Sequence, residues 1–106
     1  MTPSDAPPPE IRDNREAGRY ELQTPQGMAF AEYRPAGHAV MFTHTEVPEA
    51  LEGQGVGSRL VRAALDDARA QGKKVIPMCP FVASYIGRHH EYMDLVDPAH
   101  RSALGV

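Results

Sequence analysis

The chain has 106 residues, a formal net charge of −3 at neutral pH and 42% hydrophobic residues, which predicts a single domain of ordinary globular composition. Its eleven lysines and arginines are not clustered, and no apolar run approaches the roughly 20 residues of a membrane helix, so we expect neither a nucleic-acid surface nor a membrane span. The lone cysteine, Cys79, excludes an internal disulfide and a multi-cysteine zinc site. Together with the lack of a basic-then-apolar leader, it predicts a cytoplasmic protein.

The two ends of the chain are predicted to be tails. Residues 1–10 contain four of the ten prolines and almost no apolar side chains, which is typical of a disordered, proline-rich segment. We expect an ordered domain over residues 11–97 and a C-terminal tail over residues 98–106.

Three short segments of alternating or β-branched residues predict an antiparallel meander at the start of this domain. The expected strands cover residues 20–22, 28–34 and 38–47, with turns at residues 24–27 and 34–37. Pro48 cannot donate a hydrogen bond to a neighbouring strand, so we expect it to end the third strand.

The pattern then changes to helical spacing. Apolar residues recur every three or four positions from Val56 to Ala68, with charged residues between them, which predicts an amphipathic helix that stops at Gly72. A short apolar strand follows over residues 75–78, and Pro80 suits the first position of a second helix. The inner stripe of that helix is expected to be Phe81, Val82, Tyr85, Ile86 and His89.

The order of these elements predicts the fold class. A strand, a helix and a further strand imply a right-handed crossover between parallel strands. We therefore expect an α/β protein with a mixed, twisted sheet, an antiparallel meander followed by a parallel β-α-β end, flanked by helices.

Three glycines at alternate positions, Gly53, Gly55 and Gly57, lie between the third strand and the first helix. Glycine lets the backbone adopt positive φ and approach a ligand closely, and the N–H groups and dipole of a helix N-terminus favour an anion. We interpret this loop as a phosphate or pyrophosphate site; the alternative is a tight turn that binds nothing. It is not a Walker A loop, which needs a lysine, nor a Rossmann fingerprint, because Ser58 stands where the last glycine belongs.

The residues around the loop resemble the GNAT superfamily of N-acetyltransferases, and within it the minimal single-domain YjdJ-like proteins. The segment Glu52-Gly53-Gln54-Gly55-Val56-Gly57 is similar to the acyl-CoA pyrophosphate loop of the superfamily. Further motifs carry the similarity to the subfamily: His44-Thr45-x-Val47-Pro48, Lys74-Val75-x-Pro77-x-Cys79, Tyr85-Ile86, His89 and Glu91-Tyr92-x-Asp94-Leu95-Val96. The resemblance covers residues 44–96 strongly and residues 20–37 weakly.

This resemblance implies a minimal acyl-CoA N-acyltransferase fold that binds acetyl-CoA as co-substrate and transfers its acetyl group to an unidentified small-molecule or protein amine. In such proteins, amides of the loop and the first helical turn hold the pyrophosphate; here these would be Gly53, Gln54, Gly55, Val56, Gly57 and Ser58. The end of the preceding strand pairs with the pantetheine arm, which would involve Thr45, Glu46 and Val47. Two parallel strands splay apart around the acyl group, and Pro77 independently indicates such a gap.

Two positions depart from the superfamily's pattern. Glu52 stands where glutamine or arginine is usual, so an acid lies near the expected pyrophosphate. The tyrosine that often protonates the leaving thiolate is replaced by Gly87, and Tyr85 lies two residues before it. Tyr85 and His89 are kept as candidate coenzyme contacts of the second helix.

Two side chains are candidate catalytic residues. Cys79 is expected at the N-cap of the second helix, where the helix dipole favours a nucleophilic thiolate. It would accept the acyl group or protonate the CoA thiolate, and the alternative is a small buried hydrophobic residue. His44 is a candidate general base, and a histidine held by a local hydrogen bond is the alternative.

Other functional classes account for less of the sequence. His44 and Cys79 resemble parts of a zinc deaminase signature, which needs a second thiolate where Val82 stands. A hydrolase built on Cys79, His89 and Asp94 would leave the glycine loop unexplained. A non-catalytic module that binds acetyl-CoA stays open beside the enzyme, because the elements that build an acceptor pocket in larger GNAT enzymes are missing from the pattern.

Overall fold

The computed structural model describes residues 11–104, which are built on a five-stranded sheet with the strands in chain order. The strands are β1 Ile11–Asn14, β2 Arg19–Thr24, β3 Gly27–Ala36, β4 Ala39–Glu46 and β5 Lys74–Pro77. Strands β1 to β4 pair antiparallel and β5 pairs parallel with β4, so the predicted mixed sheet is confirmed. The proline-rich segment of residues 1–10 lies outside the described residues.

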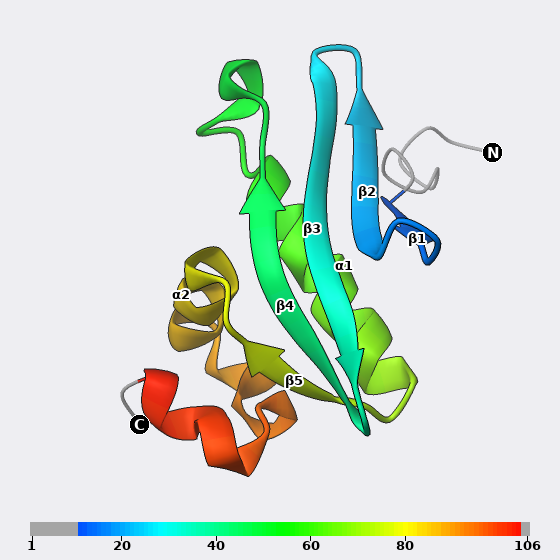
Figure 1. The fold of residues 1–106 in the computed structure, drawn as a ribbon. Helices are drawn as coiled ribbons and strands as arrows, with labels where there is room; N and C mark the ends of the chain where they lie inside the picture. The colour runs from blue at the N-terminus through cyan, green and yellow to red at the C-terminus, as the bar shows by residue number, and fades with distance from the viewer. Residues whose placement is uncertain (1–10, 105–106) are drawn as a thin grey trace, which may run out of the picture.

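Helix α1 (Val56–Ala70) crosses one face of the sheet, while the view in Figure 1 looks onto the other face of β2, β3 and β4. The buried stripe of α1 contains Leu60, Val61, Ala64, Leu65 and Ala68, as its spacing predicts. Opposite the helix, Ala29 and Ala31 of β3 are fully buried, and their small side chains allow close packing. The Tyr20 hydroxyl on β2 donates a hydrogen bond to Asp67 of α1 at 2.6 Å and joins the two layers.

The hairpin between β3 and β4 is displaced from its expected position. Strand β3 continues through Pro35, which pairs with Val40, so the turn lies between Ala36 and Ala39 and not over residues 34–37. Strand β2 pairs with β3 no further than Glu32, so the missing N–H of Pro35 has no neighbouring strand on that side to bond.

Strand β1 was not predicted, because Ile11 is its one apolar residue. Arg12 and Asn14 of β1 donate to the Glu21 carboxylate on β2 at 3.4 and 3.1 Å. Arg19 donates to the same carboxylate at 2.6 Å, which holds the pKa of Glu21 below its usual range. A network of charges across the sheet therefore stabilises a strand that carries no hydrophobic pattern.

Helix α1 ends at the predicted glycine in a Schellman motif. The N–H of Lys73 donates to the carbonyl of Ala68 at 2.9 Å, and that of Gly72 donates to the carbonyl of Arg69 at 3.0 Å. The left-handed conformation of Gly72, with φ of 69°, turns the chain into β5. The predicted crossover from β4 through α1 to β5 is therefore confirmed.

Three further helical segments follow β5: α2 (Pro80–Arg88) and the 3₁₀ helices η3 (His90–Leu95) and η4 (Pro98–Leu104), the last within the expected tail. Val82, Tyr85 and Ile86 of α2 are buried as predicted, but Phe81 is 38% exposed, so its expected place in the inner stripe is wrong. Its ring turns away from the core toward the start of α1. No helix of residues 11–104 is long and apolar enough to cross a membrane.

Candidate functional site

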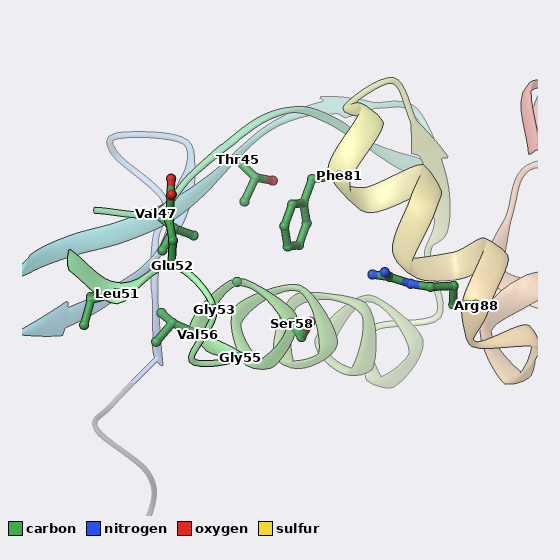
Figure 2. A pocket seen from close by; sticks show the side chains of 11 residues that line it. Thr45, Val47, Leu51, Glu52, Gly53, Gly55, Val56, Ser58, Phe81 and Arg88 are labelled. Atoms are coloured by element: carbon green, nitrogen blue, oxygen red, sulfur yellow. The ribbon is translucent and has the colours of Figure 1, made fainter. Parts of the chain in front are cut away.

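A cleft of about 520 Å³ opens where the C-terminal end of β4 meets the start of α1 and the exposed face of α2 (Figure 2). Before α1, the chain passes through the short 3₁₀ helix η2 (Glu49–Leu51) and the glycine loop. The cleft is lined by residues from all of these elements: Thr45, Val47, Leu51, Glu52, Gly53, Gly55, Val56, Gly57, Ser58, Phe81 and Arg88.

The loop leaves the N-terminus of α1 without a side-chain cap. Gly55 is the N-cap residue, with φ of 76°, and Gly53 is also left-handed, with φ of 83°. No side chain of the described residues bonds the amides of the first turn at this cap, so these amides remain available at the cleft. An uncapped helix N-terminus beside a cleft is the arrangement that an anion requires.

The three glycines of the loop are required for two different structural reasons. Gly53 and Gly55 adopt positive φ, and a Cβ atom at either would meet nothing within 4 Å, so only the backbone conformation requires glycine there. Gly57 is helical and has no positive φ, so the expectation that all three glycines free the backbone in this way is wrong. A Cβ atom on Gly57 would lie 2.6 Å from Cζ of Phe81 and 3.2 Å from Cγ2 of Val47, so this glycine makes room for the ring of Phe81.

Gln54 differs from the glycines beside it. Its backbone N–H donates to the carbonyl of Leu51 at 3.2 Å and its side-chain amide donates to Ala50 at 3.2 Å. Gln54 therefore closes the turn that follows η2, and it does not line the cleft.

The parallel strands part beside the cleft. Their pairing covers Ala39 to Phe42 on β4 and ends at Pro77 on β5, and the N–H of Cys79 then donates to the carbonyl of Phe42 at 2.8 Å. Beyond Phe42, β4 continues to Glu46 with β3 as its partner, past an irregularity in the β3–β4 pairing. The predicted gap between the two strands is confirmed, and it leaves an unpaired edge of β4 next to α2.

Cys79 lies where the pairing of β4 and β5 ends. It is the N-cap of α2, as predicted, and its side chain is buried, with the residue 3% exposed. Its Sγ atom lies 3.3 Å from Oγ1 of Thr45 on β4, so one hydrogen bond bridges the gap between the strands. Thr45 lines the cleft but Cys79 does not, which places the thiol directly behind the cleft wall.

His44 and Glu46 lie on the opposite face of the sheet from the cleft. Successive residues of a strand point to opposite faces, so Thr45 faces the α1 side while His44 and Glu46 face away from it. Nε2 of His44 lies 3.1 Å from Oε1 of Glu46, and both side chains are exposed. The His44 ring also packs beside Phe30, with their centroids 6.1 Å apart.

Tyr85 of α2 and His89 at its C-terminal end lie on the side of the helix that faces away from the cleft, and neither lines the cleft. Their rings stack with centroids 4.0 Å apart, and Nδ1 of His89 donates to the carbonyl of Tyr85 at 2.9 Å. Burial raises the pKa of Tyr85 above its usual value, so this hydroxyl stays protonated at neutral pH. Sequence spacing alone did not separate buried Tyr85 and half-buried His89 from the exposed face of the same helix.

Four residues that line the cleft were not among the predicted coenzyme contacts: Leu51, Glu52, Phe81 and Arg88. Phe81 and Arg88 are seven positions apart, which places them on one face of α2, and that face borders the cleft. Their shared spacing is the sequence signal that could have identified them. Glu52, noted as a departure, is the acid that lines the cleft. Among residues 11–104, no three His, Cys, Asp or Glu side chains gather closely enough to hold a metal ion.

Known proteins provide two comparisons with this arrangement. The family model of GCN5-related N-acetyltransferases matches residues 19–95, which include the whole cleft. The solution structure of a GCN5-like protein from Staphylococcus aureus superposes with a TM-score of 0.68 and 26% sequence identity, over 85% of this chain and 89% of that one.

Proposed function

We propose, from the membership of this chain in the GCN5-related N-acetyltransferase family, that it binds acetyl-CoA in the cleft at the start of α1 and transfers the acetyl group to an amine. The observation that carries the proposal is the uncapped N-terminus of α1, which faces the cleft beside an unpaired strand edge. The motifs around the loop further favour the minimal single-domain YjdJ-like group within the family.

The diphosphate of the coenzyme would bind at the glycine loop. Backbone N–H groups of Gly53, Gly55, Val56, Gly57 and Ser58 would donate to its oxygens, and the helix dipole would add to the attraction. Gln54 would act by holding the turn in place, since its own N–H already donates to Leu51. Glu52 would oppose binding unless its side chain stays turned away from the diphosphate.

The pantetheine arm would follow the free edge of β4. Thr45, Glu46 and Val47 lie beyond the last pair with β5, so their backbone groups can bond an extended chain laid along them. This path leads to the gap between the strands, where Thr45 and Cys79 meet. The thioester would therefore lie beside Thr45, with the buried Cys79 thiol directly behind that side chain.

Transfer would proceed by attack of the amine nitrogen on the thioester carbonyl carbon. The new carbon–nitrogen bond forms, the carbon–sulfur bond breaks, the amine loses a proton, and the CoA sulfur leaves as a thiolate that takes up a proton. Cys79 is the proposed donor of the proton that the CoA thiolate takes up; in the alternative route, the Cys79 thiolate first accepts the acetyl group from CoA and the amine then attacks the thioester on Cys79. His44 and Glu46 face away from the cleft, so the candidate base His44 does not reach an amine bound there. Tyr85 and His89 would act indirectly: their stacked rings would hold α2 in place on the side of the helix away from the coenzyme.

Calorimetry with acetyl-CoA tests the binding step, and Ser58 offers a matched pair of variants. Ser58 is the third residue of α1, where a glutamate suits the helix dipole and keeps the fold stable. We expect Ser58→Glu to bind acetyl-CoA about tenfold or more weakly than Ser58→Gln, because the carboxylate repels the diphosphate. Equal affinities of the two variants, or no heat with the unaltered protein, would contradict the proposal.

A thiol-release assay with a panel of amines tests the transfer step. Binding without release of CoA from any acceptor would favour the alternative, a non-catalytic acetyl-CoA-binding module. Mass spectrometry of the protein after incubation with acetyl-CoA tests the role of Cys79, since an acyl acceptor gains an acetyl group that Cys79→Ala cannot carry.

A further inference from the structure

Arg88 is the one basic residue among those that line the cleft. It occupies the last turn of α2, and Figure 2 shows its side chain reaching from that helix toward the first turns of α1. The only acidic residue of the lining, Glu52, comes from the loop before α1. The two charges therefore mark different parts of the cleft, one beside the glycine loop and one beside the end of α2.

The guanidinium of Arg88 has no carboxylate partner among residues 11–104. Arg12, Arg15, Arg19 and Arg69 each form an ion pair there, whereas Arg88 forms none. Arg34, Arg59 and Arg62 form none either, but of these four arginines Arg88 alone lines the cleft. Its charged face is therefore presented to the cleft. A planar guanidinium with free N–H donors is the side chain best suited to bind a phosphate monoester in a bidentate manner.

We infer that Arg88 binds the 3′-phosphate of the coenzyme and selects CoA over its 3′-dephosphorylated form. This inference rests on the proposed function. The amides of the glycine loop can satisfy the diphosphate, but they lie at the start of α1 and leave the remaining phosphate without a donor. The 3′-phosphate is a monoester with close to two negative charges, whereas the charge of the diphosphate is already shared among several amides. The guanidinium of Arg88, on the opposite side of the cleft from the glycine loop, is therefore attracted more strongly to the 3′-phosphate than to the diphosphate.

The test is a comparison of two ligands and two variants by calorimetry. CoA and 3′-dephospho-CoA are titrated into the unaltered protein, into Arg88→Met and into Arg34→Met. Arg34 is an exposed residue of β3 outside the cleft, so its replacement removes the same charge without the contact. Thermal unfolding of each variant confirms that it is folded.

We expect Arg88→Met to weaken binding of CoA by about tenfold or more, because a hydrogen-bonded pair of opposite charges is lost. Binding of 3′-dephospho-CoA should change by less than about twofold, and Arg34→Met should leave both affinities unchanged. An equal loss for both ligands would assign Arg88 to the diphosphate and overturn the inference, as would no loss for either. Failure of the unaltered protein to bind CoA at all is a different result, which would overturn the proposed function itself.

Discussion

Two alanine substitutions in the glycine loop distinguish the two reasons for glycine there: the backbone conformation at Gly55 and the space for a neighbouring ring at Gly57. At Gly55, alanine must adopt φ near 76°, but its Cβ atom meets no other atom within 4 Å. At Gly57, the backbone is helical and suits alanine, but the Cβ atom would lie 2.6 Å from the ring of Phe81. Gly55→Ala therefore tests the backbone, and Gly57→Ala tests packing.

The expected magnitudes differ in origin. A left-handed alanine costs about 1–2 kcal/mol, so Gly55→Ala should lower the free energy of unfolding by that amount. Gly57→Ala gains up to about 1 kcal/mol of helix propensity and loses about 1–3 kcal/mol to overpacking. Because Phe81 is 38% exposed, its ring can rotate outward, and we place the overpacking cost at the lower end of that range.

Removing Phe81 distinguishes the two cases. In a Phe81→Ala background, Gly57→Ala should cost clearly less than in the unaltered protein, because the 2.6 Å clash with the ring is gone and only the 3.2 Å approach to Cγ2 of Val47 remains against the gain in helix propensity. Gly55→Ala should cost the same in both backgrounds. Urea and thermal unfolding followed by circular dichroism measure both cycles, and each 1 kcal/mol corresponds to a shift of about 4–8 °C in Tm for a domain of this size. Strict additivity of Gly57→Ala and Phe81→Ala, or rescue of Gly55→Ala by Phe81→Ala, would refute the reasoning.

Three further predictions concern the residues that hold the sheet and the cleft wall. Tyr20→Phe should lower the free energy of unfolding by about 1–2 kcal/mol, because the hydroxyl donates to Asp67 at 2.6 Å; an unchanged urea midpoint would contradict this. Arg19 holds the pKa of Glu21 below its usual range, so this carboxylate stabilises the fold above its unfolded pKa of about 4.3 and ceases to do so as the pH falls through the folded pKa. Glu21→Gln should therefore flatten the pH dependence of stability between about pH 5 and pH 3, and an unaltered slope would disprove the assignment. Cys79 is 3% exposed, so a thiol reagent should modify it far more slowly in the folded protein than in urea, and equal rates would exclude the buried position.

Local sequence determined the elements that frame the site. The apolar spacing of α1, its stop at Gly72 and the N-cap at Cys79 depend on neighbours within a few residues, and each lies where the pattern predicted it. The gap between β4 and β5 was also foreseeable, because Pro77 cannot continue a ladder. The glycine loop was identified, but the separate reason for Gly57 was not.

The tertiary structure decided which side chains meet across the cleft. Strand β1 forms because Arg12 and Asn14 find Glu21 on another strand, a contact that no periodicity in residues 11–14 encodes. Phe81 and Arg88 line the cleft because α2 packs next to β4 and α1. In an isolated helix the same face would only contact solvent. Backbone preference and hydrophobic period act between neighbours in the chain, whereas the lining of a cleft depends on how separate elements pack, and that information exists only in the folded molecule.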